Sequence, residues 1–358
     1  MTLHRRWPTS GISVRKLFAR GVSVLLLSAV AAPSFGEPIR LGWQTPWATQ
    51  GQLVMGLKHT NIPELVDVEL EFVGFSYGAP LNQAALARQV DILLTADQPA
   101  IALLSRTDDY KVVSRMMYNR TCLYVPEDSP IETIVELEGE TVAGPVGAAA
   151  ERTALRALRE AGVDLETIQF GNIDMGRQAT LVAAGAKDGR WGGFDALYGF
   201  DPLPAVFEAN GLVKMIHCGR VVSVVVASRD MLENRPTELK RFLRAFYLSW
   251  YQYAVNPEKM NELFLSDSNL DFTRKALEIA ASVEPNRKAR KLSEIRLTFA
   301  PEDFEIFDEA SSFLVGKGVI SDPLDISQSR YLDSRPLEEM LEQPGTAELA
   351  ESIRIVEQ

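Results

Sequence analysis

The stretch of sequence that decides the fold runs from VPEDSPI at residues 125–131 through LEGE at 137–140 and a glycine at 147 to DA at 195–196 and DP at 201–202. It predicts an extended segment that ends at a proline, a short helix, a strand over 141–143, a turn of small residues and an amphipathic helix over 149–161. A strand over 168–170, a helix over 178–184 and a strand over 194–198 follow. Strands that alternate with helices indicate a mainly parallel sheet, so we expect this stretch to form one half of a two-lobed α/β protein.

The same alternation precedes this stretch, with strands predicted over 39–43, 66–73, 91–94 and 111–115. Asp97 before Pro99 is typical of a helix N-terminal cap. The pattern restarts at Thr141, which predicts a second sheet rather than one long one. The apolar run at 221–227 predicts a strand buried on both faces, and the helices predicted after it span 236–255, 257–265, 272–281 and 301–317. We therefore assign residues 37–121 and 228–358 to one lobe and residues 122–227 to the other, joined by two crossover strands.

The composition is that of an ordinary globular protein, with 358 residues of which 46% are hydrophobic and 24% charged. This length allows two domains. The first 36 residues differ from the rest, because a basic start without acids leads into an apolar run over 22–32 and then into small residues. That pattern is typical of an export signal, so we expect cleavage near Gly36 and a product in the periplasm.

The charge of the chain limits its partners. Removing the five lysines and arginines of the first 36 residues would take the net charge from −11 to −16. An acidic surface repels phosphate groups, so we expect no binding to nucleic acid or to anionic lipid. His59 and His217 lack metal-ligand spacing, and no serine or cysteine is paired with a histidine in a catalytic pattern. We expect no metal, no cofactor and no catalytic residues.

The chain contains two cysteines, Cys122 and Cys218. In an oxidising compartment an even number of cysteines is typical of a disulfide. The alternative is two separate buried thiols, which behave as small hydrophobic side chains. The sequence leaves both interpretations open. A bond would tie the two crossover strands together and stiffen any movement between the lobes.

Several short motifs, taken in order, resemble a known family. They are GAPLNQAAL at 78–86 with VD at 90–91, DSPI at 128–131 with LEG at 137–139, the glycine at 147, AGV at 161–163, DA at 195–196 with DP at 201–202, NP at 256–257 and YLD at 331–333. Over residues 39–337 the chain resembles the periplasmic substrate-binding proteins of ABC importers for nitrate, sulfonates and taurine, together with relatives that bind thiamine pyrimidine precursors.

The resemblance implies a type II periplasmic binding fold that closes by hinge motion around a small organic anion or zwitterion. It implies a monomer without a cofactor that delivers the solute to an ABC permease in the inner membrane. The family often has serine after the glycine at 147, whereas this chain has Ala148, which removes a hydroxyl donor and weakens the case for nitrate or a simple sulfonate. An exported enzyme or sensor module on the same fold, and a receptor for a heteroaromatic, pyrimidine-like ligand, are the alternatives.

Ligands of open α/β sheets bind at the carboxyl ends of the strands, where loops lead into helices. This rule selects the loops at 44–47, 75–78, 96–98, 145–149 and 198–201. Helix N-termini present free N–H groups and can therefore bind an anion without a lysine. The candidate ligand-binding residues are Gln44, Trp47, Ser76, Tyr77, Asp97, Gln98, Ala148, Tyr198, Asp201 and, beside a crossover strand, Arg220.

These candidates also have purely structural interpretations. The rings of Trp47, Tyr77, Tyr198 and Phe200 could form walls around an organic ligand or could fill the core of a lobe. The turns at 76–78 and 147–149 could bind an anion or could serve only the tight packing of a strand against a helix.

The charged candidates have alternatives of the same kind. Asp97 and Asp201 could bind an amine, or they could cap a helix or contact the hinge. If both face the space between the lobes, the ligand carries a cationic group, which favours a zwitterion such as taurine. Arg120 and Arg220 flank the crossover strands and could neutralise a carboxylate or sulfonate, or could pair with surface acids.

Overall fold

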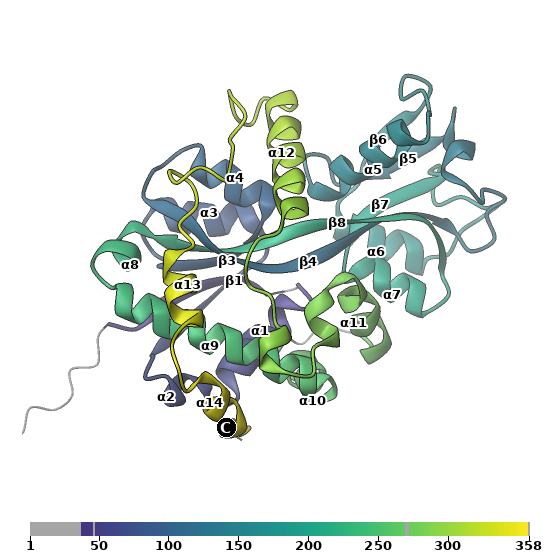
Figure 1. Ribbon diagram of the computed structural model, residues 1–358. Helices are drawn as coiled ribbons and strands as arrows, with labels where there is room; N and C mark the ends of the chain where they lie inside the picture. The colour runs from purple at the N-terminus through teal and green to yellow at the C-terminus, as the bar shows by residue number, and fades with distance from the viewer. Residues whose placement is uncertain (1–36, 46, 269–271, 357–358) are drawn as a thin grey trace, which may run out of the picture. The chain divides into compact units, whose positions relative to one another are not determined.

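The computed structural model describes residues 37–45, 47–268 and 272–356, so the export signal predicted over residues 1–36 lies outside the described residues. The described chain forms an eight-stranded sheet with helices on both faces, which confirms the predicted α/β class (Figure 1). The strands are β1 Ile39–Gln44, β2 Leu70–Phe75, β3 Ile92–Ala96, β4 Tyr110–Pro126, β5 Thr141–Gly144, β6 Gln169–Asn172, β7 Ala196–Phe200 and β8 Val213–Ser228.

The sheet contains two parallel groups that are separated by an antiparallel pair. Its spatial order is β2-β1-β3-β8-β4-β7-β5-β6. Strand β1 pairs parallel with β2 and β3, and β5 pairs parallel with β6 and β7. Between these groups β4 and β8 pair antiparallel with each other. Parallel neighbours need long crossover connections, which the chain provides as helices.

The helices before β5 are α1 Gln50–Lys58, α2 Ile62–Leu65, α3 Gly78–Leu86, α4 Asp97–Leu104 and the 3₁₀ turn Ile134–Leu137. Between β5 and β8 lie α5 Ala149–Glu160, α6 Met175–Ala183 and α7 Leu203–Ala209. After β8 the chain is helical, as predicted, with α8 Arg229–Glu233, α9 Pro236–Val255, α10 Pro257–Ser268, α11 Arg274–Ala280, α12 Pro301–Gly316, α13 Arg335–Leu341, α14 Thr346–Glu351 and short 3₁₀ turns between α11 and α12.

We call β1–β3 with α1–α4 and α8–α14 the first half, and β5–β7 with α5–α7 the second half. Strands β4 and β8 run through both. The described residues form two hydrophobic clusters in each half. In the first half, one cluster lies under α1 and α9 and extends to Ala205 of α7, and the other lies under α3, α4 and α12. In the second half, α5 covers one face of the sheet, while α6 and α7 cover the other.

The expectation of two separate sheets is wrong, because β4 and β8 form one ladder that runs from the Tyr110–Ser228 pair to the Pro126–Val213 pair. The sequence shows β4 as two short apolar runs because polar residues interrupt it. Arg115, Asn119 and Arg120 are nevertheless buried within the strand, where other parts of the chain supply their partners. Charged residues inside a strand that crosses between the halves therefore interrupt the apolar pattern, and in the sequence they resemble the end of a strand.

Two local predictions also need correction. The strand expected over 66–73 begins only at Leu70, because α2 precedes it and Asp67 has a positive φ of 55° that interrupts an extended chain. Asp97 does not cap α4 but is its first residue, and Ala96 occupies the cap position. An acid in the first turn still interacts favourably with the partial positive charge of the helix N-terminus.

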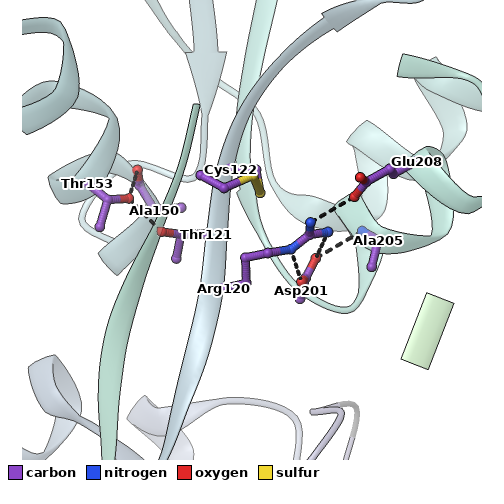
Figure 2. Close-up of a disulfide and its surroundings, with 9 residues drawn as sticks. Arg120, Thr121, Cys122, Ala150, Thr153, Asp201, Ala205 and Glu208 are labelled. Carbon is purple, nitrogen blue, oxygen red and sulfur yellow. Dashed lines mark hydrogen bonds and ion pairs between the residues drawn. A yellow bond between two sulfur atoms is a disulfide. The ribbon is translucent and has the colours of Figure 1, made fainter. Parts of the chain in front are cut away.

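The structure resolves the two interpretations of the cysteines, because Cys122 and Cys218 are bonded to each other. They are direct partners in the β4–β8 register, and their Cα atoms lie 4.2 Å apart. The bond therefore joins the two strands that cross between the halves, at the place shown in Figure 2.

Candidate functional site

The candidate site lies where strands of both halves end and helices begin. Each of the loops selected from the sequence is indeed a strand-to-helix connection, from β1 to α1, β2 to α3, β3 to α4, β5 to α5 and β7 to α7. The backbone N–H groups of the first turn in each helix have no partner within the helix. The side chains around these helix starts decide what the free N–H groups can bind.

In the first half, the ends of β1 and β3 meet through Gln44. The Gln44 N–H donates to Oε1 of Gln50 at 2.6 Å, and the Gln44 amide Nε2 lies 3.4 Å from the Thr95 hydroxyl. The side-chain atoms Gln44 Oε1 and Gln50 Nε2 are buried without a hydrogen-bond partner in the described part of the chain. Buried polar groups normally have partners, so this cluster retains binding capacity. Sequence reasoning missed Gln50 and Thr95.

Gln98 connects the two halves. Its Nε2 donates to the carbonyl oxygen of Gly147 at 2.9 Å, which places the N-terminus of α4 against the turn that begins α5. Gly147 needs glycine because its φ is 82°, and its N–H donates to the Glu151 carboxylate at 2.6 Å. Ala148 is the N-cap residue of α5 and has an extended backbone. The Gln98 Oε1 atom is buried and has no partner among the described residues.

The aromatic candidates have different environments. The ring centroids of Trp47 and Phe200 lie 5.8 Å apart, so these rings join the β1–α1 loop of the first half to the end of β7 in the second. Tyr198 is only 1% exposed and belongs to the core under α5, so its ring is a core side chain rather than an open wall. Burial, and secondarily the Glu151 charge, raise the pKa of the Tyr198 hydroxyl well above its ordinary value.

The loop before α3 is the most exposed part of the candidate site. Ser76 is exposed, and the Tyr77 side chain is 57% exposed. A Cβ on Gly78 would lie 2.6 Å from the Pro99 side chain, so this turn packs tightly on the start of α4. The close packing supports the structural interpretation for Gly78, while Ser76 and Tyr77, between β2 and α3, are exposed.

Both acidic candidates are paired with buried arginines. Asp97 Oδ2 accepts from Arg152 Nη2 at 2.6 Å, and both side chains are almost fully buried. Asp201 accepts from Arg120 Nε at 2.7 Å and from the N–H of Ala205 at 2.9 Å (Figure 2). Burial raises the pKa of Asp201, and Arg120 offsets that rise only in part. Neither carboxylate is therefore available to an amine in this conformation.

The two candidate arginines of the crossing strands have different environments. Arg120 also donates to Glu208 at 2.8 Å and is fully engaged between β4 and α7 (Figure 2). Arg220, its register partner on β8, is exposed and stacks over the Tyr118 ring at 4.3 Å. The structure thus does not bring Arg220 into contact with the other candidates. The arginine that contacts a candidate carboxylate in this region is instead Arg152 of α5, which pairs with Asp97 and which the sequence shows only as one charged residue of an amphipathic helix.

The described residues contain no group of three or more histidine, cysteine, aspartate or glutamate side chains that could hold a metal ion. Within those residues, no helix is both long and apolar enough to span a membrane.

Comparison with known proteins gives this geometry a context. A protein of Escherichia coli (strain K12) described as binding aliphatic sulfonates is 26% identical over 244 residues, which cover 65% of this chain and 72% of that protein. The periplasmic aliphatic sulphonate binding protein SsuA from Escherichia coli has a similar fold, with a TM-score of 0.65 at 19% identity over 81% of this chain and 91% of that one. The desulfurization enzyme DSZB also shares the fold, with a TM-score of 0.62 at 13% identity over 85% of this chain and 99% of that one.

The family model described as NMT1/THI5 like matches residues 67–260. This segment contains β3, α4 and α5 and both long crossing strands, and so includes most of the candidate site. Because the match covers more than half of the sequence, the chain belongs to the NMT1/THI5-like family.

Proposed function

We propose that this protein is the solute-binding component of an ABC import system and captures a small organic anion of the sulfonate type between two lobes. The lobes are residues 37–121 with 228–358, which contain β1–β3, and residues 122–227, which contain β5–β7, and strands β4 and β8 cross between them. The ligand would lie at the helix starts that follow β1, β3 and β5, in contact with Gln44, Trp47 and Gln98. The protein binds its ligand and does not transform it.

The hydrogen bond from Gln98 to Gly147 is the observation that carries this proposal. It joins the N-terminus of α4 in the first half to the N-terminal turn of α5 in the second half. Two helix N-termini that face each other present N–H donors and partial positive charge from both sides. An anion held there contacts both halves at once, which is what a receptor that closes on its ligand requires.

The pairing of the acids supports an anion without an ammonium group. A carboxylate is the strongest acceptor for the amine of a zwitterion such as taurine, and the sequence offers Asp97 and Asp201 for that purpose. Both are occupied by buried arginines, Arg152 and Arg120. Displacing either carboxylate would leave a buried charge without its partner, which is costly. We therefore rank an alkanesulfonate above taurine as the ligand.

The relatives support the cellular setting that we propose. The name of the SsuA structure places that protein in the periplasm and assigns it aliphatic sulphonates. For this chain we propose export through the N-terminal signal, a monomeric form in the periplasm, and delivery of the ligand to a permease in the inner membrane.

Calorimetric titration of the purified protein with ethanesulfonate, taurine, nitrate and an aminopyrimidine tests the proposal. We expect ethanesulfonate to bind, taurine to bind more weakly, and Gln98→Ala to weaken ethanesulfonate binding by about tenfold or more, which corresponds to about 1.4 kcal/mol. Gln89→Ala replaces an exposed glutamine between α3 and β3 and should leave the affinity unchanged.

Two outcomes would contradict the proposal. If none of the sulfonates binds while the aminopyrimidine does, the ligand class is wrong. If mass spectrometry after incubation detects a chemical product from ethanesulfonate, the protein is an enzyme on this fold rather than a receptor.

A further inference from the structure

Helix α5 of the second half is fastened to the first half by a row of polar contacts. Arg152 donates to Asp97 on α4, and Arg156 donates to Glu309 on α12 at 2.7 Å. Glu151 accepts from Lys317, just after α12, at 2.6 Å. Figure 1 shows α12 between α4 and α5, which is the position that these contacts require. Together with the Gln98–Gly147 hydrogen bond, they all involve α5 or the turn that begins it.

The Asp97–Arg152 pair differs from the others in its burial. Its side chains are 0% and 2% exposed, whereas Arg156 and Glu309 are 33% and 25% exposed. Each residue lies in the first turn of its helix, one in each half. Breaking a buried ion pair is costly, because removing one partner leaves an uncompensated charge in a place that water does not reach. Separating the halves would give both charges back to water.

The pair does not satisfy the whole guanidinium group. The Arg152 Nη1 atom is buried and has no hydrogen-bond partner among the described residues, and Nε lies 3.8 Å from Glu309. A buried donor without a partner is unfavourable, and separation of the halves would relieve it. The ion pair thus favours the arrangement in which the halves are in contact, while the Arg152 Nη1 atom, unpaired within the described chain, lowers the cost of separating them.

We propose that Asp97 and Arg152 form a latch that holds α5 against α4 and so positions the two helix N-termini around the ligand. This inference rests on the proposed function, because it assigns to the pair the control of the lobe movement that a receptor needs. Asp97 and Arg152 are positioning residues and act through Gln98 and the turn at Gly147, which they hold within hydrogen-bond distance. The latch closes without a ligand because both of its partners belong to the protein.

Small-angle X-ray scattering of ligand-free variants tests the latch. We expect Arg152→Gln and Asp97→Asn each to increase the radius of gyration. Arg152→Gln leaves Asp97 without its arginine, and Asp97→Asn leaves Arg152 with the longer contact to Glu309 at 3.8 Å, so opening exposes a poorly compensated buried charge to water. The double variant Asp97→Asn/Arg152→Gln carries neither charge, so it should be more compact than either single variant. Arg330→Gln removes the exposed Arg330–Asp108 pair within the first half and should scatter like the wild type.

Ethanesulfonate titration of the same variants gives a second measurement. Both single variants should bind about tenfold more weakly or worse, because binding must then also drive closure. Saturating ethanesulfonate should return their radius of gyration to the wild-type value. A merely structural role would instead lower the melting temperature and leave the ligand-free radius unchanged.

The two proposals fail separately. If the single variants are as compact as the wild type without ligand, or if the double variant is the most expanded, the latch proposal is wrong. This conclusion does not depend on which ligand the protein binds. If the scattering behaves as expected and no sulfonate binds to the wild type, the latch stands and the proposed ligand is wrong. Should Arg152→Gln fail to fold, Arg152→Lys keeps the charge and must show the wild-type radius for the proposal to hold.

Discussion

Cys122 and Cys218 face each other directly across the β4–β8 ladder, and their bond closes a loop between residues 96 positions apart in the sequence. This loop contains nearly the whole second half of the sheet. Next to the bond, Arg120 holds Asp201 and Thr121 contacts the Thr153 hydroxyl at 2.8 Å (Figure 2). The bond thus fixes β4 and β8 to each other at the entrance to the second half, and movement between the halves must arise elsewhere along these strands.

Replacing both cysteines, as Cys122→Ser/Cys218→Ser, should lower the free energy of unfolding by about 2–4 kcal/mol, because a long loop in the unfolded chain is no longer closed. Urea denaturation followed by circular dichroism measures the change. A reducing agent should lower the wild-type midpoint toward that of the double variant and leave the double variant unaffected. Equal midpoints for the oxidised wild type and the double variant would contradict a stabilising role.

The two aromatic candidates should respond differently to truncation. Trp47→Ala removes a partly exposed ring that contacts Phe200 across the halves, so ethanesulfonate should no longer raise the melting temperature while the ligand-free value stays within a few degrees. Tyr198→Ala empties a core position whose ring packs on Gly144, and should cost about 3–5 kcal/mol of stability. Differential scanning fluorimetry with and without ethanesulfonate compares them. A large loss of stability in Trp47→Ala would mean that this ring is core as well.

The sequence predicts the turns of the site because their positions follow from local alternation of strands and helices. Gln44 and Gln98 fall at strand ends for that reason, and the structure buries both, Gln44 as the last residue of β1 and Gln98 in the first turn of α4. The β-α pattern is short-ranged, so its periodicity can be recognised without knowledge of the tertiary structure.

The partners of the charged residues could not be predicted in the same way. Arg152 lies on an amphipathic helix whose arginines and glutamates resemble a solvated face, and its partner Asp97 is 55 residues away in the chain. Only the packing of α5 against α4 turns that face into a buried contact. Arg115 and its partner Glu284 are separated by 169 residues, and both are fully buried. Such pairings depend on which surfaces the fold brings together, and no local motif records them.

The Arg115–Glu284 pair should be essential for stability. Arg115 Nη2 donates to Glu284 Oε2 at 2.5 Å, and the same oxygen accepts from the N–H of Tyr118 at 2.7 Å, so the carboxylate ties β4 to the segment after α11. Glu284→Gln removes the carboxylate nearest to the buried Arg115 charge and leaves the more distant Asp303, whose Oδ1 lies 3.7 Å from Arg115 Nε, so it should cost about 3–5 kcal/mol in urea denaturation. Arg330→Gln, which breaks an exposed pair, is the control and should leave the midpoint unchanged. If Glu284→Gln is as stable as the wild type, Asp303 or water compensates the Arg115 charge and the pair is not essential.

Tyr110 gives the protein a dependence of stability on alkaline pH. Its hydroxyl oxygen lies 2.9 Å from the carbonyl oxygens of both Ala85 and Val90, and its single proton is shared between them. Burial, reinforced by the charge of Asp91, raises the pKa of Tyr110 from 10.0 to about 12. Between these values the unfolded chain loses the proton before the native protein does, so the native state binds more protons and the free energy of unfolding falls as the pH rises. Below about pH 10 the contribution of Tyr110 is complete.

Tyr110→Phe should therefore be less stable than the wild type at about pH 7, by about 1–2 kcal/mol, because the carbonyl groups of Ala85 and Val90 lose the hydroxyl donor that they share. The same variant should lose less stability than the wild type between about pH 9 and about pH 11.5, so the difference between the two proteins narrows there. Urea denaturation at several pH values measures both effects. Tyr77→Phe alters an exposed tyrosine and should follow the wild type throughout. Parallel curves for Tyr110→Phe and the wild type across this range would show that Tyr110 ionises at the same pH in the native and unfolded states.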